Sequence, residues 1–143
     1  MAAEPHESVI PIESDADVVL ARQRAREMSA ALELTSTDQT LLATAISEVA
    51  RNITTYAVRG EVILSMIRDA AGRRGIQVIA RDDGPGIENL ELALQDGYTS
   101  GGGLGLGLPG ARRLVHEFDI ETTPGQGTKV TLVMWERESA RAA

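Results

Sequence analysis

A glycine-rich stretch at residues 101–110, GGGLGLGLPG, constrains the fold more than any other part of the chain. Six of its ten residues are glycine, and leucines alternate with them. A flexible linker would be polar, whereas these leucines anchor the loop to a core and the glycines let backbone N–H groups approach a bulky anion. The following segment, ARRLVHEF, has helical spacing. The stretch therefore predicts a phosphate site at a helix N-terminus, and a turn without a ligand is the alternative.

The composition narrows the classes of protein to which the chain can belong. Its 143 residues suit one domain, so we expect a single domain over residues 1–143, with residues 1–7 and 137–143 frayed. The net charge of −7 argues against nucleic-acid binding, which relies on a basic surface. No run approaches the roughly 18 apolar residues that predict a membrane span. The absence of cysteine and of a signal-peptide pattern fits a cytoplasmic protein.

The hydrophobic periodicity predicts a mixed order of helices and strands. We expect a strand at residues 8–12, helices from residue 14 or 15 to about 34 and from the polar cluster 35–38 to about 57, a strand pair at 60–70 and 75–82, a short helix at 88–95, and strands at 119–123 and 128–135. The turn between the paired strands contains Arg73 and Arg74, which are most simply solvated side chains.

Two polar residues on the second predicted helix, Glu48 and Asn52, lie four positions apart. One helical turn places them on the same side, and the apolar neighbours Ala45, Val49 and Ile53 put that side next to the core. A carboxylate there can take a proton from a hydroxyl or from water, and an amide oxygen can hold a hard divalent cation. A solvated i,i+4 pair is the alternative interpretation.

The second paired strand runs directly into residues 82–87, DDGPGI. If residues 82–87 form a functional motif, Asp82 lies at the strand end and accepts a hydrogen bond from a ligand amine. Gly84 and Gly86 would then leave room for a flat ring beside the backbone. The alternative is an ordinary Asp/Gly/Pro turn.

Three other phosphate-binding folds do not fit the glycine-rich stretch. Gly105, Gly107 and Gly110 have the spacing G-x-G-x-x-G, but a dinucleotide fold needs a strand directly before them and an acid about twenty residues later, where Val130 stands. Lys129, the only lysine, is not in a P-loop pattern. The motifs of eukaryotic-type protein kinases are also absent.

The joint arrangement of four motifs resembles the GHKL ATPase family, which includes histidine kinases, Hsp90, gyrase and MutL. SEVARN lies on a helix, DDGPG follows a strand, GLGLGLPG comes after a variable segment, and GQGT opens the last strand. The resemblance covers residues 48–131 and implies the Bergerat ATP-binding fold. This is an α+β two-layer sandwich in which helices cover one face of a mixed, mostly antiparallel sheet.

The resemblance also implies a role for each residue that matches a family motif. Glu48 takes the place of the general base, Asn52 that of the Mg²⁺ ligand, and Asp82 that of the acceptor for the adenine amine. The implied ATP-binding set is Asn52, Asp82, Gly84, Gly86, Ile87, Gly103, Leu104, Gly105, Leu106, Gly107 and Thr128. Residues 87–102 correspond to the ATP lid, and we expect 96–102 to become ordered with nucleotide. ATP and Mg²⁺ are thus the implied cofactors.

Within the family, the chain is similar to the switch serine/threonine kinases of the bacterial stressosome, through ISEVARN and DGYTSGGGLGLGLPGARRLVHEF. Its only histidines, His6 and His116, are not in a phosphoacceptor context, so the phosphoryl group should go to another protein. The resemblance implies STAS-domain scaffold and antagonist proteins as substrates, followed by release and activation of a PP2C-type phosphatase in a partner-switching sigma-factor cascade.

Two other functions remain open from the sequence. An anti-sigma kinase of the same fold would phosphorylate a small anti-anti-sigma STAS protein and sequester a sigma factor directly. A catalytically idle module would only dock on a phosphatase, although intact Glu48, Asn52 and Asp82 argue against this. The acceptor residue and the oligomeric state, including a homodimer, also stay open.

Overall fold

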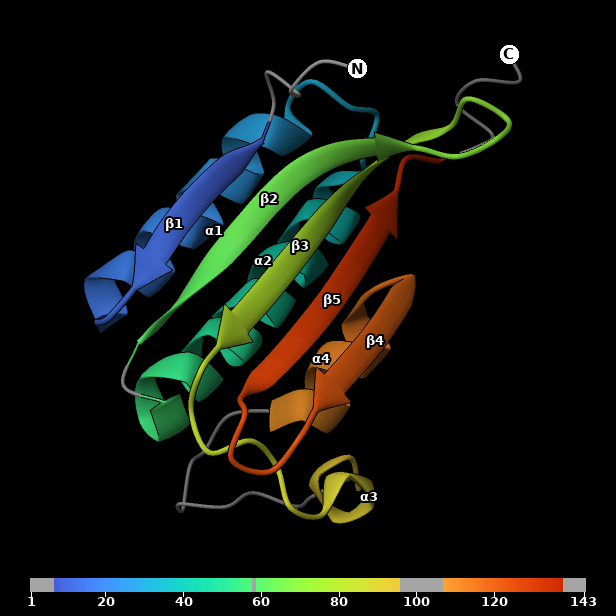
Figure 1. Cartoon of the computed structure of the whole chain (residues 1–143). Coiled ribbons are helices and arrows are strands. Elements are labelled where there is room, and N and C mark those ends of the chain that lie inside the picture. The colour runs from blue at the N-terminus through green and yellow to red at the C-terminus, as the bar shows by residue number, and fades with distance from the viewer. Residues whose placement is uncertain (1–6, 58, 96–106, 138–143) are drawn as a thin grey trace.

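The computed structural model describes residues 7–57, 59–95 and 107–137, which form two layers (Figure 1). One layer is a five-stranded sheet in the order β1-β2-β3-β5-β4, and the helices cover one of its faces. The strands are β1 (Ser8–Ile12), β2 (Gly60–Arg68), β3 (Arg74–Asp82), β4 (Glu117–Thr122) and β5 (Thr128–Trp135). The helices are α1 (Asp15–Ser29), α2 (Ser36–Asn52), α3 (Leu90–Ala93) and α4 (Gly107–Leu114), and a π-helical segment, η1 (Ile53–Ala57), continues α2. The expected α+β two-layer architecture is confirmed.

The sheet was expected to be mixed and mostly antiparallel, and its antiparallel character is confirmed. In the described ranges, every pair of neighbouring strands is antiparallel. β2 and β3 form one hairpin, and β4 and β5 form another. The pairing of β3 with β5 joins the two hairpins. This last pairing sets Asp82, at the end of β3, opposite Thr128, at the start of β5. Two sequence motifs that lie far apart in the chain therefore meet at one end of the sheet.

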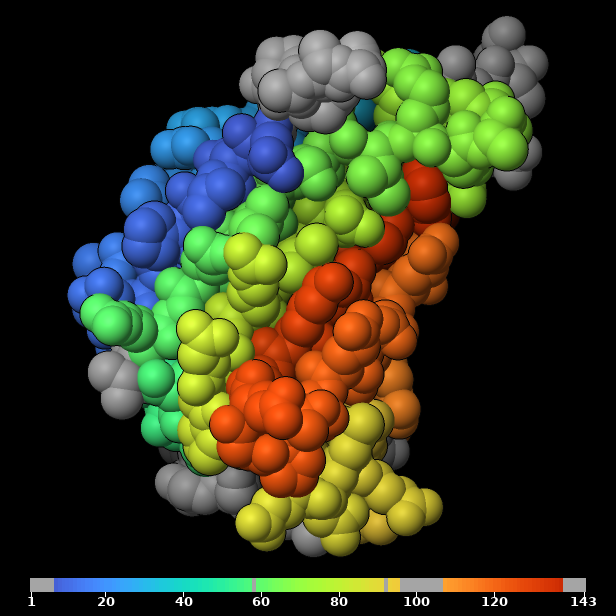
Figure 2. Space-filling model, in the orientation of Figure 1, coloured from blue at the N-terminus to red at the C-terminus, as the bar shows by residue number. Residues whose placement is uncertain are grey.

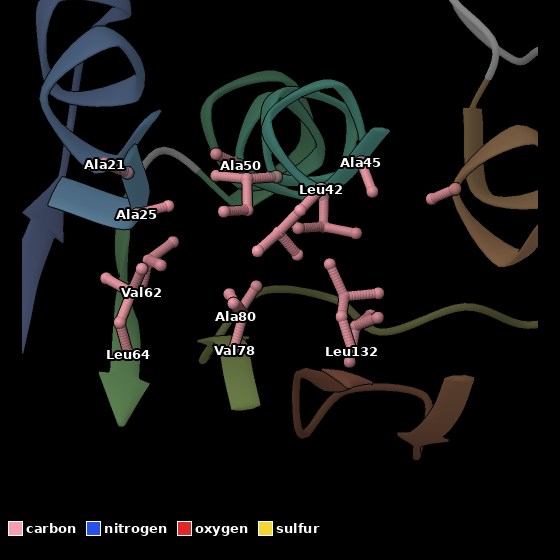
Figure 3. Close-up of a cluster of buried hydrophobic side chains, with 14 of the residues drawn as sticks. Ala21, Ala25, Leu42, Ala45, Ala50, Val62, Leu64, Val78, Ala80 and Leu132 are labelled. Atoms are coloured by element: carbon pink, nitrogen blue, oxygen red, sulfur yellow. The ribbon is translucent and has the colours of Figure 1, made fainter. Parts of the chain in front are cut away.

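An aliphatic core fills the space between the helices and the sheet (Figure 3). Side chains from α1 and α2 point toward alternate residues of β2, β3 and β5. The labelled members are Ala21, Ala25, Leu42, Ala45, Ala50, Val62, Leu64, Val78, Ala80 and Leu132. Burial of apolar surface stabilises this arrangement by roughly 25 cal/mol per Å². None of the helices in the described ranges is both long and apolar enough to cross a bilayer.

The opposite face of the sheet is the surface seen in Figure 2, where β1, β2, β3, β5 and β4 lie side by side. Along the edge strand β4, Glu117, Asp119 and Glu121 occupy alternate exposed positions. Charged side chains on an edge strand disfavour pairing with the edge of another sheet. We infer that this row of carboxylates protects the β4 edge.

Helix α1 begins as expected and ends earlier than expected. Ser14 is its N-cap, and the Oδ2 atom of Asp17 accepts a hydrogen bond from the Ser14 backbone N–H at 3.2 Å. The helix ends at Ser29, whereas the sequence predicted about residue 34. Leu32 and Leu34 are both 7% exposed. A helix would point residues two apart to nearly opposite sides, so the chain leaves the helical path to bury both leucines.

Helix α4 starts four residues before the predicted ARRLVHEF helix and ends four residues before that segment does. It begins at Gly107, inside the glycine-rich stretch, with a φ of +68° that favours glycine. It ends at Leu114, because Glu117 and Phe118 pair with β5 in strand β4. The stabilisation from pairing with β5 outweighs the helical tendency of these residues. Sequence periodicity alone cannot reveal this pairing.

A buried carboxylate, Glu136, ties three segments together directly after β5. Its side chain is 0% exposed and forms an ion pair with Arg74, with 3.1 Å between Oε1 and Nη2. It also accepts hydrogen bonds from the backbone N–H groups of Glu33, before α2, and Arg74. The expectation that Arg73 and Arg74 are merely solvated is therefore wrong, and Arg73 likewise stacks its guanidinium over the Trp135 ring at 4.7 Å.

Replacing Glu136 by glutamine should make the free energy of unfolding less dependent on pH in the acid range. Burial alone would raise the pKa of Glu136, but hydrogen bonds from Arg74 and Glu33 and the charge of Arg74 lower it from 4.5 to about 2. A lowered pKa stabilises the fold above pH 4.5, and that stabilisation is lost as the pH falls toward 2. We expect Glu136→Gln to lose about 3 kcal/mol of unfolding free energy at pH 7 and much less at pH 3.

Urea unfolding of both proteins at pH 7, 5 and 3 measures this difference. The matched control is Glu61→Gln, which breaks the exposed cross-strand pair between Glu61 and Arg81. Exposed pairs contribute about 0–1 kcal/mol, so this variant should stay close to the wild type at every pH. If Glu136→Gln loses as much unfolding free energy at pH 3 as at pH 7, the lowered pKa of Glu136 is contradicted.

Candidate active site

The candidate site lies at the end of the molecule where β3 ends, β5 begins and α2 passes into η1 (Figure 1). Asp82 pairs with Gly60 of β2 on one side and with Thr128 of β5 on the other. A Cβ atom on Gly60 would lie 3.0 Å from the Ile53 side chain and from the Asp82 Cβ. Gly60, at the start of β2, is therefore packed closely between the end of β3 and Ile53, the residue that follows Asn52.

Asp82 has the environment of a ligand-binding carboxylate. It is half-buried, and its Oδ1 atom accepts a hydrogen bond from the backbone N–H of Gly84 at 2.8 Å. Burial raises the pKa of Asp82, the Gly84 N–H and the Thr128 backbone oppose this, and the charge of Asp83 adds to it. A carboxylate whose charge is disfavoured by burial gains from an additional hydrogen-bond donor. The side chain is thus suited to accept a hydrogen bond from a ligand amine.

The two glycines that follow Asp82 are required partly by the packing of the protein itself. A Cβ atom on Gly84 would lie 2.7 Å from the Ala57 Cβ and 3.1 Å from the Asp82 Oδ1. Gly86 has a φ of +76°, and its Cβ would collide with the backbone of Thr123. These contacts are with η1 and with the turn between β4 and β5. That both glycines line an adenine pocket stays a prediction.

Glu48 is a buried carboxylate with both oxygens engaged. The residue is 9% exposed although it lies on α2, four residues before the half-buried Asn52. Its Oε1 atom accepts a hydrogen bond from the backbone N–H of Gly107 at 2.9 Å, and its Oε2 atom lies 3.2 Å from the Nη1 of Arg51. The solvated i,i+4 pair is therefore not what the structure shows for Glu48. The carboxylate instead faces the N-terminus of α4.

A hydroxyl that the sequence analysis did not single out, Thr122, links the segment after β3 to the second hairpin. Its Oγ1 atom accepts a hydrogen bond from the Ile87 backbone N–H at 2.9 Å. The same atom lies 3.0 Å from the Thr128 Oγ1 and 3.1 Å from the Gly127 carbonyl oxygen. Ile87 and Thr128, two predicted ATP-binding residues, thereby share one hydrogen-bond network. No sequence signal marks Thr122, since its partner Ile87 is 35 residues away.

Part of the predicted site cannot be placed. Gly103, Leu104, Gly105 and Leu106 lie outside the described residues, as does the predicted lid segment 96–102. Of the phosphate-binding stretch, the structure describes Gly107, which begins α4 and donates its N–H to Glu48.

The described residues fit the nucleotide and metal that the motifs imply. Asp82 offers a half-buried acceptor, Asn52 offers an amide oxygen that a hard cation accepts as a ligand, and α4 begins at Gly107, whose N–H donates to the Glu48 Oε1. A helix N-terminus favours negative charge, and here a carboxylate already occupies it. The acceptor groups of Asp82 and Asn52 are thus of the kind that bind a purine amine and a divalent cation.

Residues 37–138 match the family described as histidine kinase-, DNA gyrase B-, and HSP90-like ATPase. The chain belongs to this family. The four motifs of the sequence, including Glu48, Asn52 and Asp82, all fall within the matched residues. The expected Bergerat-type fold is therefore confirmed.

Two curated relatives indicate to which members of this ATPase family the chain is similar. The chain is 40% identical to the serine/threonine-protein kinase RsbT of Bacillus subtilis (strain 168) over 131 residues, which cover 92% of this chain and 98% of RsbT. It is 30% identical to an anti-sigma F factor of Caldanaerobacter subterraneus subsp. tengcongensis over 95 residues, or 64% of this chain and 66% of that protein. The chain is thus a relative of RsbT over nearly the full length of both.

Solved structures support the same fold. The crystal structure of the RsbU and RsbW domains of Rv1364c from Mycobacterium tuberculosis superimposes with a TM-score of 0.60 at 20% identity, covering 91% of this chain and 33% of that one. The mycobacterial sensor histidine kinase MprB gives a TM-score of 0.53 at 20% identity, covering 92% of this chain and 98% of that chain. At these identities the similarity concerns the fold alone.

Proposed function

We propose that the chain is an ATP- and Mg²⁺-dependent serine/threonine protein kinase that acts in a partner-switching cascade. The observation that carries the proposal is the position of Glu48, a buried carboxylate held against the N-terminus of α4 and one helical turn before Asn52. This position supports the proposal that Glu48 acts as a base and Asn52 as a metal ligand, next to a helix N-terminus of the kind that binds phosphate. The near full-length similarity to RsbT supports protein phosphorylation as the outcome.

The proposed chemistry is a transfer of the γ-phosphoryl group to a hydroxyl. The acceptor oxygen attacks the γ-phosphorus and forms a new P–O bond, while the bond to the β,γ-bridging oxygen breaks and its electron pair leaves with ADP. Glu48 accepts the hydroxyl proton. Positioning and charge neutralisation dominate the catalysis of such a transfer, so few catalytic side chains are needed.

Each of the other residues in the proposed site has one task. Asp82 accepts a hydrogen bond from the adenine amine and thereby orients the base, with Gly84, Gly86, Ile87 and Thr128 around it. Asn52 holds Mg²⁺ through its amide oxygen, and the cation, when bound, neutralises charge on the phosphates. The glycine-rich residues that precede α4 supply backbone N–H groups to the triphosphate, while the Gly107 N–H donates to Glu48.

The proposed substrates are STAS-domain scaffold and antagonist proteins in the cytoplasm. After phosphorylating them, the kinase is released and activates a PP2C-type phosphatase, which leads to release of a sigma factor. The similarity to RsbT over 98% of that protein favours this over an idle docking module. A homodimer is compatible with this scheme.

A second candidate is an anti-sigma kinase that phosphorylates an anti-anti-sigma STAS protein and sequesters a sigma factor directly. The observation in its favour is the 30% identity to an anti-sigma F factor. That similarity covers 64% of the chain, compared with 92% for RsbT, and so we rank it second.

Incubation with γ-³²P-labelled ATP and purified STAS-domain proteins of the same genome tests the proposal. We expect label on a serine or threonine of a STAS protein, dependent on Mg²⁺ and on this chain. Pull-downs against a sigma factor and against a PP2C-type phosphatase separate the two candidates, with capture of the phosphatase expected. Binding to the phosphatase without any transfer of label would instead favour the idle module.

A further inference from the structure

Arg51, between Glu48 and Asn52 in the sequence, has no role in the function proposed above. Its guanidinium Nη1 lies 3.2 Å from the Glu48 Oε2. The Arg51 side chain is 49% exposed, whereas that of Glu48 is 10% exposed. The cation therefore reaches the buried carboxylate from the solvent side of α2.

This pair differs from an ordinary ion pair on a helix surface. On α1, the Arg24 and Glu27 side chains form an i,i+3 pair that is 41% and 71% exposed. Such pairs contribute a few tenths of a kcal/mol to helix stability, because water screens both charges. In the pair formed by Arg51, the Glu48 carboxylate is shielded from water. The contact with Arg51 therefore also determines the orientation of that carboxylate.

The two oxygens of Glu48 are held from two elements. The Gly107 N–H of α4 fixes Oε1, and Arg51 of α2 fixes Oε2. Each carboxylate oxygen has two lone pairs, so Oε2 can accept the Arg51 hydrogen bond and still take up a proton. Loss of one of these two contacts would let the side chain leave its orientation, and a reacting group displaced by about 1 Å can cost 100-fold in rate.

We propose that Arg51 is a positioning residue that holds the Glu48 carboxylate in the orientation needed for proton transfer. The inference rests on the proposed function, in which Glu48 is the base. Arg51 acts through Glu48 and makes no contribution of its own to the reacting atoms. Its effect should therefore fall on the rate of transfer and vanish when Glu48 no longer acts as a base.

The test compares Arg51→Gln and Arg51→Lys with the wild type in the phosphotransfer assay to a STAS-domain protein. Arg51→Gln should lower kcat by about 10- to 100-fold. ATP affinity by calorimetry and the Tm should remain close to the wild-type values, which separates orientation of the base from a structural role. Arg51→Lys keeps the positive charge and should recover part of the rate. The control, Arg24→Gln, removes the exposed pair on α1 and the hydrogen bond from Arg24 to the Ser8 hydroxyl of β1, and it should transfer phosphate at the wild-type rate.

A double-mutant cycle with Glu48→Gln decides between action through Glu48 and an independent role. In the Glu48→Gln background, Arg51→Gln should change kcat by less than about twofold, since no base is left to orient. If the two substitutions lower kcat by factors that multiply in the double variant, Arg51 acts separately from Glu48, for example on the phosphates, and the inference is overturned. A wild-type rate for Arg51→Gln, or equal rates for the Lys and Gln variants below that of the wild type, would overturn it as well. A wild-type rate for Glu48→Gln alone would instead remove the proposed base itself.

Discussion

Asp82→Asn should weaken ATP binding by about 10- to 100-fold, which corresponds to the roughly 1.5–3 kcal/mol that a hydrogen bond to a charged group contributes. The Asn carbonyl oxygen can keep the hydrogen bond that Asp82 accepts from the Gly84 N–H. Its amide NH₂ would then face the site of the adenine amine, so two donors meet. Isothermal titration calorimetry with ATP and Mg²⁺ measures the effect.

The folded protein itself should tolerate Asp82→Asn. Burial raises the pKa of Asp82, which means that the protein gains nothing from its charge when no ligand is bound. We expect an unchanged or slightly higher Tm. The matched control is Asp83→Asn, which neutralises the exposed neighbouring carboxylate and should leave ATP affinity nearly unchanged. Wild-type affinity of a folded Asp82→Asn variant would show that this carboxylate does not bind adenine.

The correctly predicted positions of Glu48 on a helix and Asp82 at a strand end depend on local periodicity. The helical period put Glu48 on the core side of α2, and the end of an apolar run put Asp82 at the end of β3. Both follow from neighbours within a few residues. The spacing of the hydrophobic residues also sufficed for the order of the elements, since buried faces impose periods of 3.6 and 2.

The features that the sequence could not predict depend on residues far apart in the chain. Glu48 meets Gly107 across 59 positions, and Glu136 meets Arg74 across 62. No periodic pattern encodes such a contact, because it arises when separate elements pack. The early end of α1 has the same origin, as the core takes up Leu32 and Leu34 against the local helical tendency. Thr122 is missed for this reason, because its partner Ile87 lies 35 positions away.

Glu48→Gln should lower phosphotransfer by about 10²–10⁴-fold, the usual contribution of a general base. Glutamine has nearly the same shape, and its amide oxygen can still accept the hydrogen bond from Gly107 that fixes the start of α4. The substitution thus removes basicity while retaining the contact between α2 and α4. Because Asp82 and not Glu48 is the proposed partner of the adenine, ATP affinity should change little.

Asn52→Asp separates the base from the metal ligand on the same helix. It adds a negative charge where a neutral amide oxygen would hold Mg²⁺, so it should change the Mg²⁺ dependence of transfer, whereas Glu48→Gln should not. Transfer of label to a STAS-domain protein at saturating ATP, over a series of Mg²⁺ concentrations, distinguishes the two variants. Binding to the phosphatase should survive Glu48→Gln, since docking needs a surface and not a base. Should Glu48→Gln transfer phosphate at the wild-type rate, Glu48 is a structural cap for α4 and the proton goes elsewhere.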